Sequence, residues 1–230
     1  MRGCSAMEEG MKASVLYMVR FWVSPEEGKP FLDWLNGGHI AEVVREPGFL
    51  WARQYQLEGL DENGWRAHIT VYGVDTLESF KNYLNSRARE RFMQESEQFK
   101  GLFRAERLSG PVDVDLPSPG HTGEEEAQAV YCVRFSVSPK SHRAFLEWLN
   151  SEHMAEVVRQ PGFLWARRVH LEERDEDGWE RYIIIYGKST HETLREYLNN
   201  HPYERFPQQC EPLFQDLRKE NFYGTLELAL

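Results

Sequence analysis

The sequence has little cysteine and no long apolar run, and each absence excludes a class of protein. Its three cysteines, Cys4, Cys132 and Cys210, are an odd number at unrelated positions, which argues against a disulfide framework or a zinc cluster. No stretch approaches the roughly 18 apolar residues of a membrane span, so no membrane partner is expected. The apolar run after the N-terminus aligns with residues 131–137 and predicts a strand, not a signal peptide. We therefore expect a cytoplasmic protein.

Positive charge is also in short supply. Lysine and arginine total 27 against 37 aspartate and glutamate, for a formal net charge of -10. Nucleic-acid binding needs a basic face, and neither part of the sequence offers one, so no nucleic-acid partner is expected. The hydrophobic content of 41%, with 13% aromatic residues, is ample for a globular core.

One stretch occurs twice and organises the chain. Residues 34–53 read WLNGGHIAEVVREPGFLWAR and residues 148–167 read WLNSEHMAEVVRQPGFLWAR, an offset of 114 residues (148 minus 34). The match extends without gaps, with roughly half of the aligned positions identical, and identifies a tandem duplication. The predicted domain organisation is a disordered N-terminal extension (1–12), a first repeat (13–114), an exposed linker (115–128) and a second repeat (129–230).

Each repeat is predicted to run strand, helix, strand, strand, helix, strand. Alternating β-branched and aromatic residues predict first strands over 15–23 and 129–137. Ser24 and Ser138, each followed by proline, are expected to start the first helices. One face of the first helix carries Phe31, Leu35 and His39, although Gly37-Gly38 could break this copy. Hairpins, second helices and last strands near 103–114 and 217–228 complete the pattern.

A unit of this order forms a four-stranded antiparallel sheet with both helices on one face. The first strand is apolar on both faces, with Tyr17 and Phe21 on one and Leu16 and Met18 on the other, so the second face must also be covered. The tethered twin is the obvious cover. We predict an α+β protein in which two ferredoxin-like repeats close an intramolecular, pseudo-dimeric barrel, with further homo-oligomerisation left open.

These residues resemble the dimeric α+β barrel superfamily, here with both halves in one chain. The core WLNxxHxAEVVRxPGFLWAR, with a strand before it and Tyr-Gly after the hairpin, is similar to a small bacterial domain family of unknown function. It also resembles EthD-like and antibiotic-biosynthesis monooxygenase-like proteins, whose first helix carries a similar histidine followed by Pro-Gly. Superfamily members include cofactor-free oxygenases, isomerases, dehydratases and haem proteins, so the resemblance implies the fold and no single reaction.

The candidate catalytic residues are His39 and its twin His153. Each imidazole lies in the middle of an apolar helix stripe, between helix and sheet, and its pKa range suits proton transfer. The alternative is a core histidine that is hydrogen-bonded to a backbone carbonyl. His-x-x-Glu alone supplies two metal ligands where a site needs three, so no metal and no cofactor are expected.

The candidate substrate-binding residues come in pairs at equivalent positions: Arg53 and Arg167, Tyr72 and Tyr186, Trp51 and Trp165, Glu42 and Glu156. The arginines lie in aromatic rows, where a guanidinium could bind a carboxylate or enolate or form a structural ion pair. The tyrosines could donate a hydroxyl to a pocket. The glutamates could orient the histidines or lie in water at the rim.

Two functional hypotheses remain open. The first is a cofactor-independent monooxygenase, isomerase or dehydratase that acts on a small apolar or aromatic molecule. The second is a non-catalytic ligand-binding or assembly module, with haem binding as a third and weaker alternative. The two pockets are expected to differ, because four strand residues of the first repeat are exchanged in the second: Tyr55 for Val169, His68 for Tyr182, Trp22 for Ser136 and Thr70 for Ile184.

Overall fold

The computed structural model describes residues 12–200 and 217–230, so most of the predicted N-terminal extension lies outside the described residues. The first repeat contains, in order, β1 (Val15–Val23), α1 (Lys29–Trp34), the π turn η1 (Leu35–His39), α2 (Ile40–Val44), β2 (Phe49–Leu60), β3 (Arg66–Val74), α3 (Leu77–Leu84), α4 (Arg87–Ser96), η2 (Glu97–Phe99) and β4 (Phe103–Pro117). The second repeat contains β5 (Ala129–Val137), α5 (His142–Trp148), the π turn η3 (Leu149–His153), α6 (Met154–Val158), β6 (Phe163–His170), β7 (Glu180–Lys188), α7 (His191–Asn199) and β8 (Leu217–Ala229).

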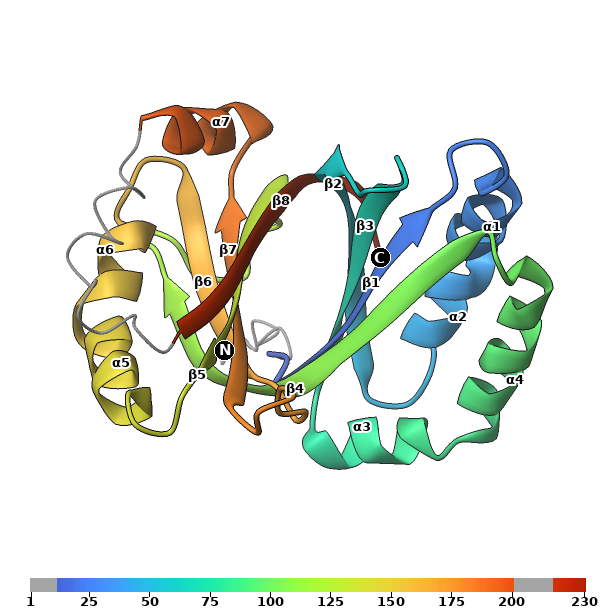
Figure 1. Cartoon of the computed structure of the whole chain (residues 1–230), viewed down its shortest axis with the longest axis horizontal. Helices are drawn as coiled ribbons and strands as arrows, with labels where there is room; N and C mark the ends of the chain where they lie inside the picture. Colours follow the sequence, from blue (N-terminus) through green and yellow to red (C-terminus); the bar gives the residue numbers. More distant parts are fainter. Residues whose placement is uncertain (1–11, 201–216) are drawn as a thin grey trace, which may run out of the picture.

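The eight strands close into one barrel, in the order β1-β3-β2-β8-β5-β7-β6-β4, and every pairing is antiparallel. Within each repeat the first and third strands lie in the middle of the sheet, as in a ferredoxin-like unit. The two repeats join at two seams, where β2 pairs with β8 and β4 pairs with β6. Figure 1 shows the strands between two outer groups of helices. The predicted intramolecular α+β barrel is confirmed.

Twin glycines lie at the two seams. A Cβ atom added to Gly110 would lie 1.9 Å from the carbonyl oxygen of His170, and one added to Gly224 would lie 2.1 Å from that of Gln56. Both distances are far below van der Waals contact with backbone atoms that cannot move aside. Glycine at these equivalent positions therefore permits the close approach of strands from different repeats.

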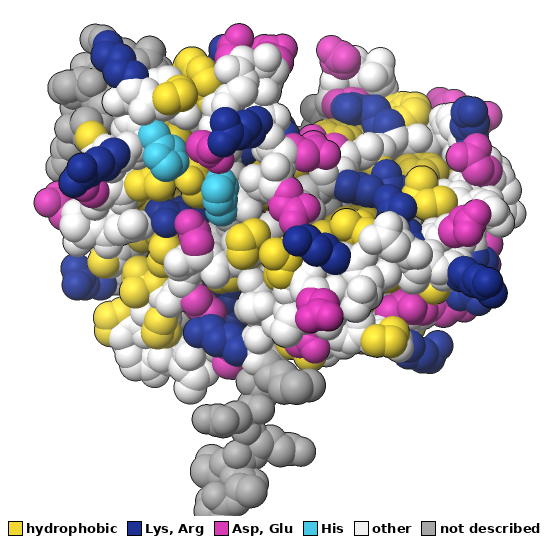
Figure 2. Space-filling model, turned by 90° about the horizontal axis from the view of Figure 1, so that it is seen from below, with side chains coloured by type: hydrophobic (Ala, Val, Ile, Leu, Met, Phe, Trp, Pro, Cys, Tyr) yellow, Lys and Arg dark blue, Asp and Glu magenta, His cyan; other side chains and the backbone are white. Residues whose placement is uncertain are grey.

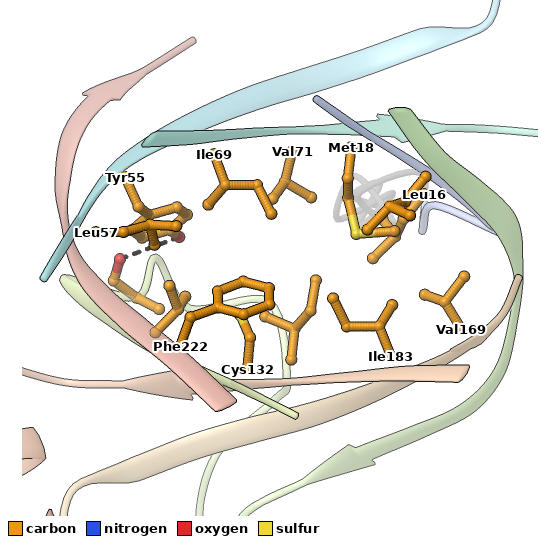
Figure 3. Packing of buried hydrophobic residues seen from close by; sticks show 14 of the residues in the cluster. Leu16, Met18, Tyr55, Leu57, Ile69, Val71, Cys132, Val169, Ile183 and Phe222 are labelled. Atoms are coloured by element: carbon orange, nitrogen blue, oxygen red, sulfur yellow. Dashed lines mark hydrogen bonds between the residues drawn. The ribbon is translucent and has the colours of Figure 1, made fainter. Parts of the chain in front are cut away.

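The barrel interior is a packed apolar core to which both repeats contribute. Leu16 and Met18 of β1 lie on one side of this core, and Cys132 of β5 and Ile183 of β7 lie on the opposite side, as Figure 3 shows. Cys132 is a free thiol, and burial raises its pKa to about 12, so it acts here as a small apolar side chain. Because each sheet supplies one wall, neither repeat has a complete core by itself.

A quartet of charged side chains also bridges the two repeats inside the barrel. Arg20 binds Glu220 at 2.6 Å and Glu106 at 3.4 Å, and Arg134 binds Glu106 at 2.8 Å and also contacts Glu220. The two arginines occupy equivalent positions in the repeats, as do the two glutamates. We call these four residues the interior quartet. Each arginine binds a carboxylate of its own repeat and one of the other.

The opposite face of each sheet packs against its own helices. In the first repeat Phe21 of β1 meets Phe31 of α1, and in the second Phe135 of β5 meets Phe145 of α5. Two separate apolar clusters result, one between each sheet and its helices. The second strand face thus finds its cover in the twin, as the two-sided apolar pattern predicts.

The first helices begin later than predicted. α1 starts at Lys29 and α5 at His142, because Ser24 and Ser138 each form a turn before the helix. The carbonyl of Ser24 accepts a hydrogen bond from Gly28 N at 2.9 Å, and that of Ser138 accepts one from His142 N at 2.9 Å. The Ser-Pro pairs therefore mark the end of the strand rather than the helix N-cap.

Both first helices are interrupted by one π turn at the same place. The sequence led us to expect a break at Gly37-Gly38 alone, but the second repeat makes the same turn through Ser151 and Glu152. Glycine is therefore not its cause. Gly38 adds a local kink to the first copy, with a φ of 171°. Turns of this kind are rare and occur frequently at functional sites.

The surface shows no gathering of one charge on the side seen from below. Figure 2 shows acidic and basic side chains interspersed across that face, with apolar side chains between them. Within residues 12–200 and 217–230, no helix is both long enough and apolar enough to cross a membrane.

Candidate functional site

Each repeat holds a cavity between its sheet and its interrupted first helix, and a histidine lines each one. The cavity beside His39 and the cavity beside His153 both measure about 70 Å³. Aromatic side chains make up much of both walls; the second cavity is lined by Tyr131, Phe135, Phe145, Trp148, Tyr186 and Tyr197, among others. Open space beside an imidazole is what a ligand site needs and what a filled core lacks.

The π turn sets the orientation of each histidine. His39 stacks on Trp34, with ring centroids 4.1 Å apart, and His153 stacks on Trp148 at 4.5 Å; both pairs have an interplanar angle of 21°. Residues five apart in an α-helix lie about 140° apart around the axis, so such a pair could not stack there. The wider turn brings them to the same side. The interruption thus has a visible consequence: it places a histidine and a tryptophan together at the cavity.

The His39 ring has further apolar contacts. The edge of Phe92 in α4 meets it, with ring centroids 4.8 Å apart and planes at 88°. Its Nδ1 atom is buried and makes no hydrogen bond within the described residues. The residue aligned with Phe92 in the second repeat is Phe206, which lies outside the described residues.

Burial keeps both imidazoles neutral. Loss of hydration lowers the pKa of His39 to about 4, with a smaller contribution from Arg91. The same effect lowers the pKa of His153 to about 4, with a smaller contribution from Lys219. At neutral pH each ring therefore offers an uncharged nitrogen that can accept a hydrogen bond or a proton.

The structure brings Tyr72 and Tyr186 to the same cavities as the histidines. Tyr72 stacks on Tyr17 at 5.7 Å and lines the first cavity, and Tyr186 stacks on Tyr131 at 6.0 Å and lines the second. Burial raises the pKa of both phenols well above the usual value of 10, so they remain protonated.

The candidate arginines and tryptophans lie elsewhere. Arg53 lies over the Trp51 ring at 4.6 Å and Arg167 over the Trp165 ring at 4.7 Å. All four surround a space of about 10 Å³ inside the barrel, on the face of the sheet opposite the histidine cavities. Each indole also packs on a glycine: a Cβ on Gly73 would lie 2.3 Å from the Trp51 ring. These side chains are thus not assembled with His39 or His153.

Arg167 is occupied by the segment between the repeats. Its guanidinium donates to the carbonyl of Gly123 at 2.7 Å and binds Glu124 at 3.1 Å and Asp115 at 3.3 Å. Trp165 Nε1 donates to the Glu125 carbonyl at 2.9 Å. The structural ion pair considered from the sequence is therefore present at Arg167. It fastens the segment after β4 to the barrel.

The two candidate glutamates do not orient the histidines. The Glu42 carboxylate binds Arg91 of α4 at 3.1 Å on the outer side of the helix. The Glu156 carboxylate makes no hydrogen bond or ion pair within residues 12–200 and 217–230. Glu42 is partly buried and Glu156 is exposed, which places both at the rim.

The four positions at which the repeats were expected to differ lie on two faces of the sheets, the cavity face and the barrel face. Thr70 and Ile184 line the histidine cavities. Tyr55 and Val169 instead belong to the barrel core, and Trp22 packs against it. His68 stacks on Phe21, outside the cavity lining, and binds Glu227 at 2.9 Å. The exchange of Thr70 for Ile184 is the one of the four that changes the cavity walls.

Two arginines of the first cavity were not predicted from the sequence. Arg89 of α4 and Arg107 of β4 line it together with Tyr17. Arg107 pairs in register with Val19 of β1, a cavity residue. The side of β4 on which Arg107 lies could have indicated that it faces the cavity. That inference requires the register between β1 and β4, which are far apart in the sequence.

In the part of the chain that the structure describes, no group of three or more His, Cys, Asp or Glu side chains is arranged to hold a metal ion. The cavities present imidazole, phenol and aromatic surfaces, with Arg89 and Arg107 in the first and Lys219 and Asn221 in the second.

The closed barrel of two ferredoxin-like halves defines a dimeric α+β barrel protein with both halves in one chain. The chain belongs to the family described as a domain of unknown function, DUF4286, which matches residues 14–107 and again residues 128–220. No curated protein matches the chain.

Solved structures share the fold over nearly the whole chain at low identity. A "putative monooxygenase" from Fusobacterium nucleatum is 12% identical, with a TM-score of 0.64 and 94% of each chain covered. An anthrone oxidase-like protein is 12% identical, with a TM-score of 0.68, covering 96% of this chain and 94% of that one. A chlorite dismutase variant from Candidatus Nitrospira defluvii is 11% identical, with a TM-score of 0.55, covering 94% and 93%. At these identities the likeness concerns the fold alone.

Proposed function

We propose that each half of the chain binds one small, largely apolar aromatic molecule between its sheet and its first helix, with His39 or His153 as proton acceptor. The chain would then be a cofactor-independent enzyme of the monooxygenase, isomerase or dehydratase type. The observation that carries the proposal is the cavity beside a neutral, tryptophan-stacked histidine in both repeats.

The walls favour a planar apolar ligand. In the second cavity Phe135, Trp148 and Tyr197 offer ring faces and edges, which gain more from contact with another ring than from water. A space of about 70 Å³ corresponds to about five water-sized positions, which limits the occupant to roughly one ring. The similarity in fold to a putative monooxygenase and an anthrone oxidase-like protein is consistent with such a ligand.

The chemistry would be proton abstraction in an apolar space. A neutral imidazole accepts a proton from an acidic C–H or O–H of the ligand, and a protonated phenol donates a hydrogen bond to the oxygen on which charge develops. Tyr186 lines the cavity of His153, and Tyr72 lines that of His39. Each cavity thus has one acceptor and one donor of this kind.

A non-catalytic binding role is the second candidate, and the histidine pKa favours it. A general base works best with a pKa near the working pH, and a value of about 4 makes the imidazole a weak base in the empty cavity. In this role the histidine would accept a hydrogen bond and the proton would stay on the ligand.

The cavity residues do not fit a haem. A porphyrin ring is far larger than a cavity with room for about five water-sized positions. The face of His39 is covered by Trp34, and Phe92 meets its ring edge-on. The proposed function therefore does not use haem.

Binding can be tested by calorimetric titration with benzyl alcohol. Val19→Phe and Val133→Phe place a ring in the first and second cavity respectively, at equivalent positions. We expect two binding events in the natural protein, one in each variant and none in the double variant. Unchanged binding in the double variant would exclude both cavities.

Proton transfer can be tested without knowledge of the reaction. The ketone 2-indanone, which carries acidic C–H bonds, is incubated with the protein in deuterated water, and deuterium uptake is followed by NMR. An enzyme should accelerate the uptake, and His39→Phe combined with His153→Phe should abolish the acceleration. Binding of the ketone with no acceleration would support the non-catalytic alternative.

A further inference from the structure

A row of four residues crosses the sheet beneath the helix of the first repeat. Gln54 of β2 pairs with Thr70 of β3, Thr70 pairs with Val19 of β1, and Val19 pairs with Arg107 of β4. Paired residues point to the same face of a sheet, and Val19, Thr70 and Arg107 all line the cavity of His39. We call this row the cavity floor of the first repeat.

One end of this floor is buried, polar and without partners. Thr70 is 1% exposed and Gln54 is 0% exposed. The Thr70 hydroxyl and both polar atoms of the Gln54 side-chain amide make no hydrogen bond within the described residues. Burial of polar atoms in this state is costly and rare in folded proteins. For Thr70, which lines the cavity, it points to a polar group of a ligand; Gln54 lies beside Thr70 on the neighbouring strand.

The other end is basic and lacks a counter-charge. Arg107 and Arg89 line the cavity, and neither forms an ion pair within the described residues. Their side-chain contacts there are with neutral groups: Arg107 interacts with the Tyr17 hydroxyl and donates to the sulfur of Met93 at 3.4 Å, and Arg89 donates to the carbonyl of Leu84 at 3.4 Å. No carboxylate side chain lines this cavity. Two guanidinium groups at one end of an aromatic space are suited to an anion.

The second repeat differs at three of the four positions. Its floor runs Arg168, Ile184, Val133 and Asn221 by the same pairings. Arg168 is fully engaged, since it binds Asp113 at 2.9 Å and Asn150 at 2.6 Å. The middle of the floor is apolar. Lys219 and Asn221 also line this cavity, so the second floor serves as an internal control for Thr70 and Gln54 only.

We propose that the cavity of the first repeat binds a small aromatic carboxylate that carries a hydroxyl group opposite its carboxylate. Arg107 and Arg89 hold the carboxylate, the ring lies on Val19 beneath His39, and the hydroxyl reaches Thr70. This inference rests on the proposed function, because it assigns the ligand class of the same cavity.

The dimensions of the sheet match such a ligand. Thr70 and Arg107 are separated by two strand spacings, or about 10 Å between Cα atoms. After the side chains are allowed for, this leaves the length of one ring with a polar group at each end. Met93 and Arg89, which line the same cavity from α4, have flexible side chains that can adjust to it.

The test is a calorimetric comparison of 4-hydroxybenzoate, benzoate and 4-hydroxybenzyl alcohol on the whole chain. We expect the natural protein to bind 4-hydroxybenzoate at least about tenfold more tightly than the alcohol, since charged hydrogen bonds are the stronger ones. Arg107→Asn and Thr70→Ile introduce the residues that the second repeat carries in the same fold. The first should abolish the preference for the acid over the alcohol. The second should abolish the preference for the hydroxy acid over benzoate.

Arg143→Asn, which changes an exposed arginine of α5 that lines neither cavity, is the matched control, and it should leave the affinity for 4-hydroxybenzoate unchanged. Equal affinity for acid and alcohol in the natural protein would overturn the inference while the proposed function stands. Loss of acid binding in Val133→Phe but not in Val19→Phe would also overturn it, because the acid would then occupy the other cavity. Binding of none of the three compounds would overturn both the inference and the proposed function.

Discussion

The two halves share one framework but treat their polar groups differently. Both stack a histidine on a tryptophan through the same π turn. Beneath that pair, the second half binds Arg168 to Asp113 and Asn150, whereas the first half leaves Gln54 and Thr70 without partners in the described residues.

This difference shows which positions of a duplicated fold can vary between the two copies. The turn, the stack and the seam glycines support the barrel and are the same in both copies. The floor under the helix contributes less to the barrel and differs at three of four positions. A half whose cavity floor is bonded or apolar is expected to be more stable, and a half whose floor holds unbonded polar groups is expected to bind polar ligands. The following predictions test this comparison, from the largest expected effect to the smallest.

The largest effect is expected at the interior quartet. Arg20→Met leaves Glu106 and Glu220 with one arginine and should lower the free energy of unfolding by about 3 kcal/mol. Arg134→Met should cost less, about 1 to 2 kcal/mol, because its side chain is 21% exposed against 9% for Arg20. Urea denaturation measures both values. Arg143→Met, which removes an exposed ion pair with Glu147, is the control and should change little. Equal small losses at both interior arginines would show that the quartet does not hold the halves together.

The histidines should make the protein sensitive to acid. Their folded pKa of about 4 lies below the unfolded value of 6.5, so the unfolded chain binds more protons between these values. The free energy of unfolding should therefore fall as the pH drops from 6.5 to 4, by about 2 kcal/mol for each ring after allowance for partial exposure. His39→Phe and His153→Phe should each remove part of this fall, and the melting temperature of His153→Phe at pH 7 should be unchanged or raised. A pH profile identical to that of the natural protein would refute the buried neutral state.

An exchange at the cavity floor should move stability in opposite directions. Ile184→Thr introduces an unbonded hydroxyl into the second half and should lower the free energy of unfolding by about 2 kcal/mol. Thr70→Ile removes one from the first half and should raise it by about 1 kcal/mol. Thermal melting of the two variants and of the double exchange measures this. If both single variants are destabilised, the first half does not carry unbonded polar groups at a cost.

The smallest effect concerns Lys188, which occupies the position of Val74 in the first half. Its ammonium group donates to the Pro161 carbonyl at 2.7 Å and lies 3.9 Å from the Phe163 ring, and burial lowers its pKa to about 8. Because the unfolded value is 10.5, the unfolded chain binds more protons between pH 8 and 10.5, and stability should rise with pH across this window. Lys188→Val should lack about 1 kcal/mol of that rise. The difference between the two unfolding curves, measured at pH 7 and pH 10, isolates the lysine from other groups.

The strands were predictable because alternation leaves a direct trace in the sequence. The prediction for β1 agrees with Val15–Val23 and that for β5 with Ala129–Val137. The closed barrel followed from a strand that is apolar on both faces, since each face requires a cover.

The same two-faced pattern explains what could not be predicted. When both faces of a strand are apolar, the sequence does not tell which face meets the helices. Arg53 and Trp51 were candidate substrate-binding residues, but they face the barrel interior, away from the histidines. The π turn could not be predicted either. The first copy has Asn-Gly-Gly at this place and the second has Asn-Ser-Glu, so the two copies have no helix-breaking residue in common. The place of Arg107 in the cavity depends on the pairing of β4 with β1, two strands far apart in the sequence, and no local pattern predicts that pairing.

The two seams have a consequence for how such a protein can change. In a barrel built from two identical chains, every substitution occurs twice, and a residue that favours one ligand also alters the other site. Here β4 and β8 close the same ring within a single chain, so position 70 can be threonine while position 184 is isoleucine. Because the two halves are parts of one chain, their sequences need not be identical. Each cavity can therefore become specific for its own ligand without a change to the other.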